Sequence, residues 1–531
     1  MAQTNLPILF VFIVAVIILL VNYPWGVYFS VTEYYVSNSG SDFNDGLTPS
    51  TPWRTINKVN SEFGNSIGIG DNIYFCCGDS FTDAQLTIGI SGESISNPTV
   101  IGAYGIGDKP VLSPGGYTVT LDSKENITFQ DIKIEECSRW IHAPNGGNSY
   151  ITFDNCDFYN STAWGGIYFT NGNDHIIIRN CHFENNSEDV VELNFGTTYT
   201  LVENNTFRGG VLNDHDLIVI RGSVAYPSHY NIVRNNTFYQ GSDQYIALSQ
   251  EVHHCLIENN IVNGTDRNDI LAGIKLCGTW NNIIRNNIIY DCNASAIQIY
   301  TNNPGSYESH GENNTVYHNT VYNCTGGDGY ACSKVIVFDD PGGVLCNNVF
   351  KNNIFYKGYS IVYMDAVNPY DYLLFDNLWD NNIINGHTGT NAIKSNGTYY
   401  SLSQIESQLS DTFQNNTNLD PLLADAANHN FSLNDTSPCI DNASWLTTCD
   451  GGGTGTTVTV HDARYFCDGY GIVNGDDITI GTDDVTVTSV DYDNNNLTVN
   501  TSITWVDGDN VSLRYNGSAP DIGAIESARK L

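Results

Sequence analysis

A short pattern of apolar and polar residues recurs along most of the chain. An Asn is followed by alternating apolar and polar residues, as in IENNIVNG at 257–264 and RNNIIYDC at 285–292. The first Asn of successive copies is Asn155, Asn180, Asn204, Asn235, Asn259, Asn286, Asn352 and Asn381. The shortest spacings between copies are 24 and 25 residues. The pattern predicts one structural unit of about 24 residues that is repeated along the chain.

Each unit contains a second apolar segment, such as VVELNF at 190–195, LIVIRG at 217–222 and GIKLCG at 273–278. Its second and fourth residues are apolar, and its third and fifth are mostly polar, which is typical of a strand with one buried face. No long helical pattern separates these strands, so doubly wound and barrel folds with helices are disfavoured. Short strands could also form a sandwich, but the 24-residue self-similarity favours a parallel β-helix. Equivalent residues of neighbouring coils then stack about 4.8 Å apart.

The repeated Asn fits a turn of such a coil for two reasons. Asn tolerates the left-handed backbone that a tight turn requires. Stacked Asn side chains can also form a hydrogen-bonded ladder from coil to coil.

With these repeats, the sequence resembles the right-handed parallel β-helix proteins of the pectate-lyase-like superfamily. YYVSNSGSDFNDGLTPSTPWRTINKVN at 34–60 resembles their opening segment, and NLDPLLADAANHNFSLNDTSPCID from Asn418 and PDIGAIE from Pro520 resemble their closing segment. The resemblance implies an all-β, right-handed parallel β-helix with an N-terminal cap over 31–449. A small all-β insert is expected at 450–517 and the closing segment of the β-helix at 518–531. We expect the insert to cover the last coil, because the open ends of such a column are exposed sheet edges.

The first residues differ in composition from the rest. Residues 6–21, LPILFVFIVAVIILLV, contain no polar or charged side chain and predict a hydrophobic helix. Residues 1–30 are therefore expected to be a signal peptide or an uncleaved N-terminal membrane anchor. Both alternatives place the remaining chain at the cell surface or outside the cell, with the membrane contacted only through this segment. Several N-x-S/T triplets are compatible with glycosylation in that compartment, although an Asn- and Thr-rich repeat also produces them by chance.

The charge of the chain excludes one class of partner. There are 58 Asp and Glu residues against 21 Lys and Arg, which gives a formal net charge of -37. Such a surface repels nucleic acid, so we expect no nucleic-acid partner.

Two cysteine pairs are equivalent in the repeat alignment, Cys156 with Cys181 and Cys292 with Cys324. They could form disulfides between coils or stack as small apolar residues. Cys439 and Cys449 bracket a loop and are a better candidate for a disulfide.

The outward residues of the second apolar segments predict a long shallow face made of two columns. The third-position column is Tyr168, Glu192, Val219, Ala247, Lys275, Gln298, Val337 and Tyr363, and the fifth-position column is Thr170, Asn194, Arg221, Ser249, Cys277, Tyr300, Asp339 and Asp365. Aromatic rings among hydrogen-bonding groups suit sugar recognition, although an ordinary solvated sheet face is the alternative. The candidate substrate-binding residues are Glu192, Asn194, Gln298, Tyr300, Asp339 and Asp365.

The resemblance to β-helix polysaccharide lyases implies specific roles on this face. Lys275 would be the base that removes the proton alpha to a uronate carboxylate, and Arg221 would bind that carboxylate. Glu192, Asp216 and Asp189 would be the ligands of a possible Ca²⁺ ion. The acidic surroundings count against Lys275, because a lysine base needs a lowered pKa.

Two further groups of residues are candidates for chemistry. Asp339 and Asp365 are equivalent on neighbouring coils and could act as the paired carboxylates of an inverting glycoside hydrolase, although the G-H-G and R-I-K patterns of β-helix polygalacturonases are absent. His215 with His253 could serve as acid and base, or hold a metal.

The sequence therefore predicts an exported protein that binds polysaccharide or another glycan, as a lyase more than a hydrolase. The alternative is a non-catalytic glycan-binding or adhesive surface protein.

Overall fold

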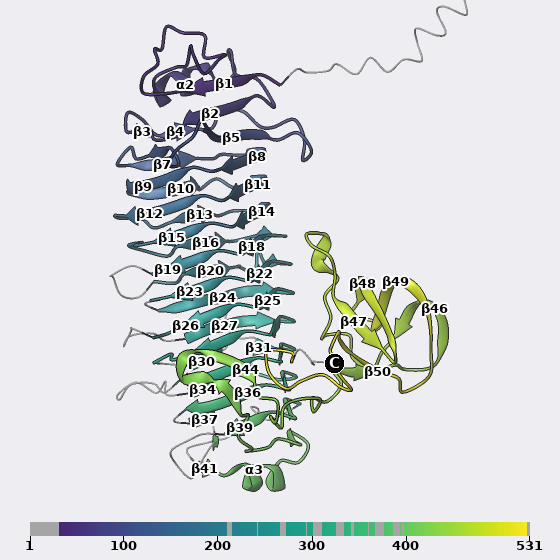
Figure 1. Cartoon of the computed structure of the whole chain (residues 1–531). Helices are drawn as coiled ribbons and strands as arrows, with labels where there is room; N and C mark the ends of the chain where they lie inside the picture. The colour runs from purple at the N-terminus through teal and green to yellow at the C-terminus, as the bar shows by residue number, and fades with distance from the viewer. Residues whose placement is uncertain are drawn as a thin grey trace, which may run out of the picture.

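The computed structural model shows an all-β protein in which three parallel sheets wind into one column (Figure 1). It describes residues 31–209, 215–241, 243–265, 272–293, 295–300, 311–324, 334–340, 345–358, 360–366, 376–385, 393–395 and 398–527. The predicted hydrophobic helix within residues 1–30 lies outside the described residues. In the part of the chain that is described, no helix has the length and apolar character needed to cross a membrane.

Each of the three sheets contributes one strand to nearly every coil. The first sheet contains β1 (Glu33–Val36), β2 (Asn72–Cys76), β5 (Thr99–Tyr104), β8 (Glu125–Gln130), β11 (Ser149–Asp154), β14 (Asn173–Arg179), β17 (Thr197–Thr198), β18 (Leu201–Glu203), β22 (Ile232–Arg234), β25 (Leu256–Glu258), β28 (Ile283–Arg285), β32 (Thr315–Tyr317), β35 (Val349–Lys351), β38 (Leu378–Asp380) and β42 (Phe413–Gln414). The second sheet contains β4 (Leu86–Thr87), β7 (Tyr117–Thr120), β10 (Arg139–Ala143), β13 (Ile167–Phe169), β16 (Val191–Asn194), β20 (Ile218–Arg221), β21 (Ser228–His229), β24 (Gln244–His253), β27 (Ala272–Trp280), β30 (Ser295–Tyr300), β31 (Gly311–Glu312), β34 (Lys334–Asp340), β37 (Ser360–Ala366), β40 (Ile393–Ser395) and β41 (Thr398–Tyr400). The third sheet contains β3 (Ser80–Phe81), β6 (Val111–Leu112), β9 (Lys133–Cys137), β12 (Asp157–Ser161), β15 (His182–Glu184), β19 (Thr206–Arg208), β23 (Thr237–Tyr239), β26 (Ile261–Asn263), β29 (Ile288–Tyr290), β33 (Thr320–Cys324), β36 (Ile354–Gly358) and β39 (Ile383–Asn385).

The interior of the column is built from stacked copies of the inward residues. Phe158, Phe183, Phe207 and Phe238 follow one another on successive coils, with ring centroids 4.7 to 4.9 Å apart. All four side chains are buried in one continuous apolar core. Stacking at the rung spacing of a parallel sheet therefore turns a sequence repeat into a packed column.

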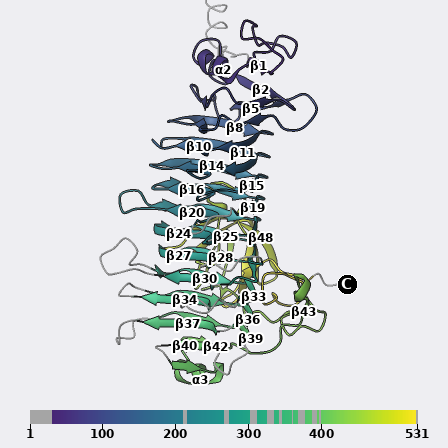
Figure 2. The same ribbon diagram turned by 90° about the vertical axis from the view of Figure 1, so that its left-hand side faces the viewer.

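Two short helices cover the ends of this column (Figure 2). Helix α2 (Ile56–Glu62) buries Ile56 and Val59 at the β1 end, and α3 (Leu402–Gln408) buries Ile405 at the other end. Thr55 and Ser401 cap the two helices, with their side chains accepting backbone N–H bonds from Lys58 and Gln404.

The two Asn residues of the repeated motif have different roles. The first, as in Asn259, adopts a left-handed backbone with φ of 54° and turns the chain. The second, as in Asn260, is buried and joins a ladder inside the column. Its Nδ2 donates to Oδ1 of the next member at 2.8 to 3.1 Å, through Asn205, Asn236, Asn260, Asn287, Asn319, Asn353, Asn382 and Asn416.

Replacing Asn260 with Leu is expected to lower the free energy of unfolding by roughly 2–4 kcal/mol. The change leaves the Asn236 backbone N–H and the Val233 carbonyl, which bond to Asn260 at 3.1 and 2.9 Å, without a partner inside the column. The measurement is the urea midpoint. Asn259→Gly is the matched control, because glycine also adopts the left-handed backbone, and it should change stability by less than about 1 kcal/mol. Equal losses for both variants would contradict the buried ladder.

Residues 447–513 form a separate six-stranded antiparallel sheet of β45 (Thr447–Thr448), β46 (Gly453–Thr459), β47 (Asp477–Ile480), β48 (Asp483–Asp491), β49 (Asn496–Trp505) and β50 (Asn510–Leu513). We call it the flank unit, because it packs on the outer face of the first sheet (Figure 1). Its buried residues share one apolar cluster with Leu201, Ile232, Leu256 and Ile283. The expectation that this unit covers the last coil is therefore wrong. A hairpin of β43 (Leu423–Asp425) and β44 (Asn430–Leu433) precedes it and packs on the third sheet through Phe431.

The candidate disulfides do not form in the structure. Cys156, Cys181, Cys292 and Cys324 are buried free thiols, so they stack as small apolar residues. Cys439 packs near Ile354 and Ile522, whereas Cys449 lies in the core of the flank unit. The prediction of a Cys439–Cys449 disulfide is wrong for this reason.

Candidate functional site

The strand register of the second sheet stacks the predicted columns. Tyr168, Glu192, Val219, Ala247, Lys275 and Gln298 are successive partners, as are Asn194, Arg221, Ser249, Cys277 and Tyr300. The backbone of Tyr300 pairs with Asp339, and that of Asp339 with Asp365. The side chains of these three residues lie outside the described part of the structure. Lys275 and Gln298 lie on β27 and β30, beyond the acidic end of the face.

The acidic end is centred on the carboxyl group of Glu192. Its side chain is only 12% exposed. Arg139 Nη1 lies 3.4 Å from Glu192 Oε1, and Asn194 Nδ2 donates to Glu192 Oε2 at 3.3 Å. The Arg139 guanidinium also lies 4.4 Å above the ring of Tyr168. Burial, with a contribution from the Asp189 charge, raises the pKa of Glu192 to about 7, although Arg139 and Arg221 oppose that shift.

A second carboxylate is held beside Glu192 by its own partners. Arg221 Nη2 lies 3.3 Å from Asp189 Oδ2 and 3.8 Å from Asp216 Oδ2. Asp189 Oδ1 also accepts the backbone N–H of Asp216 at 2.8 Å. A cation and a backbone donor therefore stabilise the negative charge of Asp189. Asp216 is more deeply buried, and this burial, with the Asp189 and Asp243 charges, raises its pKa to about 8.

The turns before β16 and β20 add further ionisable groups. His215 Nδ1 lies 3.2 Å from Glu188 Oε2 and 4.0 Å from Asp189 Oδ1. His253 is at the far end of β24, where its ring stacks between His229 and Trp280. The predicted pairing of His215 with His253 is therefore wrong, because the length of β24 separates them.

Two buried polar atoms in the site are available to bond a ligand. Nε of Arg139 and Oδ1 of Asn194 have no hydrogen-bond partner among the described residues. Other buried polar atoms of the described residues also have no partner, but this pair lies beside a buried carboxyl group, where a ligand could bond to it. Both atoms belong to residues that contact Glu192 through another atom of the same side chain.

The predicted calcium ligands lie close together, but their carboxyl groups contact arginine side chains of the protein. Asp189 and Asp216 share Arg221, and Glu192 contacts Arg139. Within the described ranges, no group of three or more His, Cys, Asp or Glu residues is arranged to hold a metal ion. Calcium binding stays a prediction.

Arg139 and Glu188 were not identified from the sequence as site residues. Arg139 lies on β10, whose sequence RWIHA departs from the template of the other strands. The scarcity of cations in the chain, 21 Lys and Arg in 531 residues, was a signal that could have drawn attention to Arg139.

Replacing Asp216 with Asn is expected to stabilise the protein at alkaline pH. The unfolded pKa of an Asp is about 3.9, whereas Asp216 in the folded protein has a pKa of about 8. The folded state therefore binds the extra proton between these values, and stability falls as pH rises through that window. The variant should melt several degrees higher than the wild type at pH 9 and at a similar temperature at pH 4. Asp435→Asn, at an exposed position, controls for the loss of charge. If Asp216→Asn raised the melting temperature equally at pH 4 and pH 9, the raised pKa of Asp216 would be contradicted.

Comparison with known proteins supports the fold. The sequence matches the family model "Right handed beta helix region" over residues 86–240 and 166–336. This match and the parallel sheets confirm the resemblance to right-handed parallel β-helix proteins. Residues outside 86–336 lie beyond the match.

The matches to individual proteins are short or distant. A lacto-N-biosidase from Bifidobacterium longum subsp. longum is 37% identical over 90 residues, which is 16% of this chain and 6% of that protein. The chain thus spans a small part of the curated relative it matches. A GH136 lacto-N-biosidase from Eubacterium ramulus aligns with a TM-score of 0.45 at 14% identity, over 73% of this chain and 68% of that one. Pectate lyase Pel9A aligns with a TM-score of 0.41 at 15% identity, over 94% and 97% of the two chains.

Proposed function

We propose that this right-handed parallel β-helix protein is a cell-surface or extracellular enzyme that hydrolyses a glycosidic bond of a glycan. Glu192 is the proton donor and Asp189 is the partner carboxylate. The observation that carries the proposal is the buried carboxyl group of Glu192, whose pKa is raised to about 7 beside the charge of Asp189. Glycoside hydrolases typically use two carboxyl groups that are held in different environments.

The residues of the site divide the work of such a reaction. Protonated Glu192 gives its proton to the leaving oxygen as the bond from that oxygen to the anomeric carbon breaks. Water adds to the anomeric carbon, and its proton passes to the Asp189 carboxylate. Arg221 holds Asp189 in place, and the negative charge of Asp189 stabilises the positive charge that develops on the sugar ring.

The surroundings of Glu192 favour a sugar as the ligand. The buried Nε of Arg139 and Oδ1 of Asn194 offer one donor and one acceptor, which is the combination that a sugar hydroxyl satisfies. The ring of Tyr168 adds an aromatic surface to the same face. The name of the bifidobacterial relative, lacto-N-biosidase, is consistent with a carbohydrate substrate.

A second candidate is the β-elimination of a uronate polymer. The charges of Arg221 and Lys275 both act to lower the pKa of Asp216, which supports a role for the two cations near the same carboxyl group. A calcium ion bound near Asp189 would be needed to neutralise the substrate carboxylate in this reaction.

The two reactions give different products, and this difference is the test. The protein is incubated with neutral, acetamido and uronate-containing oligosaccharides, and both new reducing ends and the ultraviolet absorbance of unsaturated products are measured. Hydrolysis predicts reducing ends without that absorbance and no requirement for added calcium. Unsaturated products that depend on calcium and on Lys275 would replace the hydrolase proposal by the lyase one. Cleavage of none of these glycans would overturn both.

A further inference from the structure

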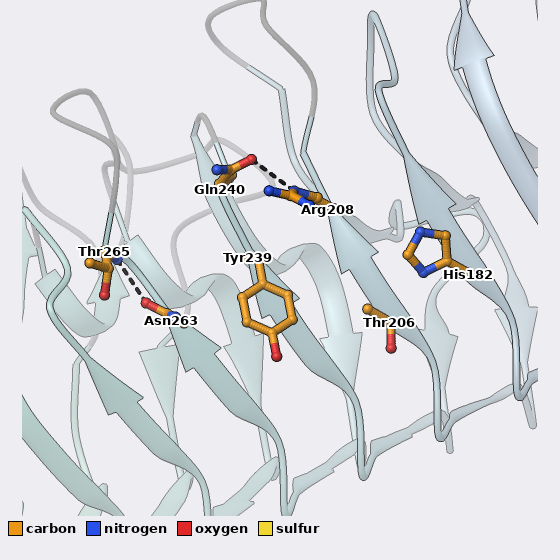
Figure 3. Close-up of a pocket in the computed structure, with 7 residues that line it drawn as sticks. All are labelled: His182, Thr206, Arg208, Tyr239, Gln240, Asn263 and Thr265. Atoms are coloured by element: carbon orange, nitrogen blue, oxygen red, sulfur yellow. Dashed lines mark hydrogen bonds between the residues drawn. The ribbon is translucent and has the colours of Figure 1, made fainter. Parts of the chain in front are cut away.

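A cavity lined by polar and aromatic side chains lies on the outer face of the third sheet, away from Glu192. It crosses four successive coils, from β15 through β19 and β23 to β26, and has a volume of about 230 Å³. Its lining includes His182, Thr206, Arg208, Tyr239, Gln240 and Asn263 (Figure 3). We call it the third-sheet cavity.

Tyr239 lies at the centre of this cavity. Figure 3 shows its ring between Thr206 and Asn263. The side chain is 38% exposed, which is unusual for a large aromatic residue of this column. Arg208 and Asn263 are its partners on the two neighbouring strands, so the three side chains stand in one row about 4.8 Å apart.

The polar groups around Tyr239 are held in position by their own contacts. Arg208 Nε donates to Gln240 Oε1 at 3.1 Å, and Arg208 Nη1 lies 4.0 Å from Glu184 Oε1. Asn263 Oδ1 accepts the backbone N–H of Thr265 at 2.9 Å. Side chains that are already ordered lose little further freedom when a ligand binds, which favours binding.

We propose that the third-sheet cavity is a sugar-binding subsite that holds one pyranose unit of a glycan. The face of the Tyr239 ring packs against the apolar face of the sugar, and Arg208 and Asn263 bond its hydroxyl groups. The volume favours a small ligand, because pockets that bind drug-sized molecules have volumes of about 300–1,000 Å³. This inference rests on the proposed function and extends it, since it adds a glycan contact remote from the reacting bond.

The connection between the sheets places both sites on the same coils. Arg208, Tyr239 and Asn263 are the last residues of their third-sheet strands, where the chain turns toward the second sheet. In the coil of β15, residues 185–190 make this turn, and Asp189 lies within it just before β16. A glycan that contacts Tyr239 together with Asp189 and Glu192 has to extend across two coils.

Affinity electrophoresis in native gels tests the inference. The gels contain soluble arabinogalactan, xylan, galactomannan or alginate, and the full chain carries Glu192→Gln so that the polymer stays intact. Adding Tyr239→Ala should weaken the retardation by about tenfold or more in apparent dissociation constant, and Tyr239→Phe should keep it within about threefold because the ring remains. Tyr226→Ala, at another exposed tyrosine, is the matched control and should bind like its parent.

The outcomes separate this inference from the proposed hydrolysis. No retardation in any gel, or retardation that Tyr239→Ala leaves unchanged, would overturn the subsite. The protein could also show retardation that depends on Tyr239 but cleave no glycan. That result would support the subsite and contradict the hydrolase proposal. Circular dichroism of each variant shows that a loss of binding does not come from unfolding.

Discussion

Replacing Glu192 with Gln should lower kcat/KM for glycan hydrolysis by about 10²- to 10⁴-fold, the range that general acid catalysis supplies. Gln has nearly the same shape and keeps one oxygen, which can accept from Arg139, while its NH₂ group replaces the oxygen that accepts from Asn194. The fold should therefore persist. Gln has no acidic proton to give to the leaving oxygen. The loss should therefore appear in kcat more than in KM.

The same group should set the alkaline limit of activity. The pKa of Glu192 is about 7, and the reaction needs its protonated form. In the wild type, kcat/KM should therefore fall as pH rises through about 7, and this limb should disappear in the residual activity of Glu192→Gln. Glu188→Gln is the matched control, because it makes the same chemical change at a half-exposed carboxyl group nearby and should change the rate only a few-fold. A Glu192→Gln enzyme that keeps more than a tenth of the activity would contradict the assignment.

The register of the candidate face was predictable because two periods coincide in the sequence. Alternation of apolar residues fixes which side chains point outward, and the 24-residue repeat fixes which of them are neighbours. Glu192, Arg221 and Lys275 accordingly lie in the columns that the alignment predicts. Alignment of the repeats does not predict contacts between residues at positions that are not equivalent. Arg139 reaches Glu192 from two coils away, and the burial that raises the pKa of Glu192 depends on all its neighbours.

The position of the flank unit had a sequence signal of its own, separate from the repeated motif. The first-sheet strands carry two successive apolar residues before the motif, as in Leu256 and Ile257 or Ile283 and Ile284. The second of each pair points into the column, and the first points outward into the cluster shared with the flank unit. An outward row of apolar residues on a solvated sheet indicates a covering element. The sequence therefore predicts that this row is covered, but it does not predict that the flank unit is the covering element.

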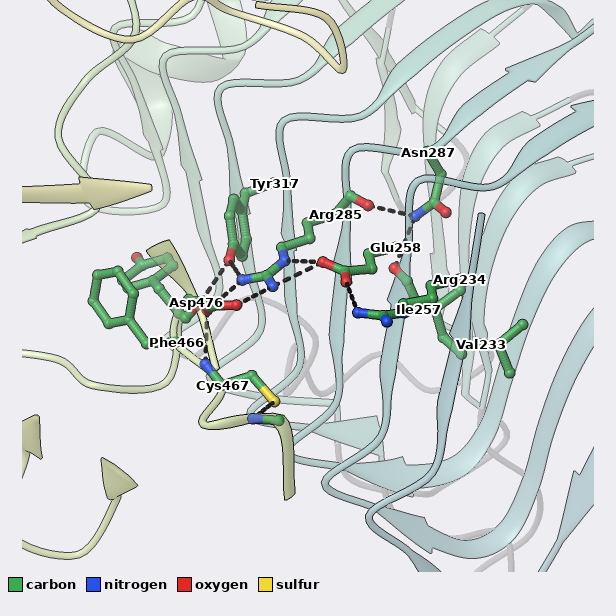
Figure 4. A network of polar contacts seen from close by, with 12 residues as sticks. Val233, Arg234, Ile257, Glu258, Arg285, Asn287, Tyr317, Phe466, Cys467 and Asp476 are labelled. Atoms are coloured by element: carbon green, nitrogen blue, oxygen red, sulfur yellow. Dashed lines mark hydrogen bonds and ion pairs between the residues drawn. The ribbon is translucent and has the colours of Figure 1, made fainter. Parts of the chain in front are cut away.

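Arg285→Met should loosen the flank unit from the column and destabilise the protein by about 3–5 kcal/mol, which is typical of removing one partner from a buried ion pair. Arg285 ends β28 and is only 3% exposed. Its Nε donates to Glu258 at 2.9 Å and its Nη1 to Asp476 of the flank unit at 2.7 Å and to Tyr317 at 3.0 Å (Figure 4). Without the guanidinium, two carboxylates remain buried at the contact without their common cation.

Hydrogen exchange of residues 447–513, compared with that of the column, measures this effect. The Arg285→Met variant should exchange faster across the flank unit while the Asn ladder stays protected, because the ladder lies inside a separate core. Arg514→Met is the matched control: its ion pair with Asp484 is largely exposed, at 3.2 Å, and should contribute less than about 1 kcal/mol. Adding Asp476→Leu to Arg285→Met should recover part of the loss, because it removes one stranded charge and places an apolar side chain in the contact. The free energy lost in the double variant could instead equal the sum of the losses in the two single variants. That result would contradict a coupling through the ion pair and leave the apolar cluster as the contact that holds the flank unit on the column.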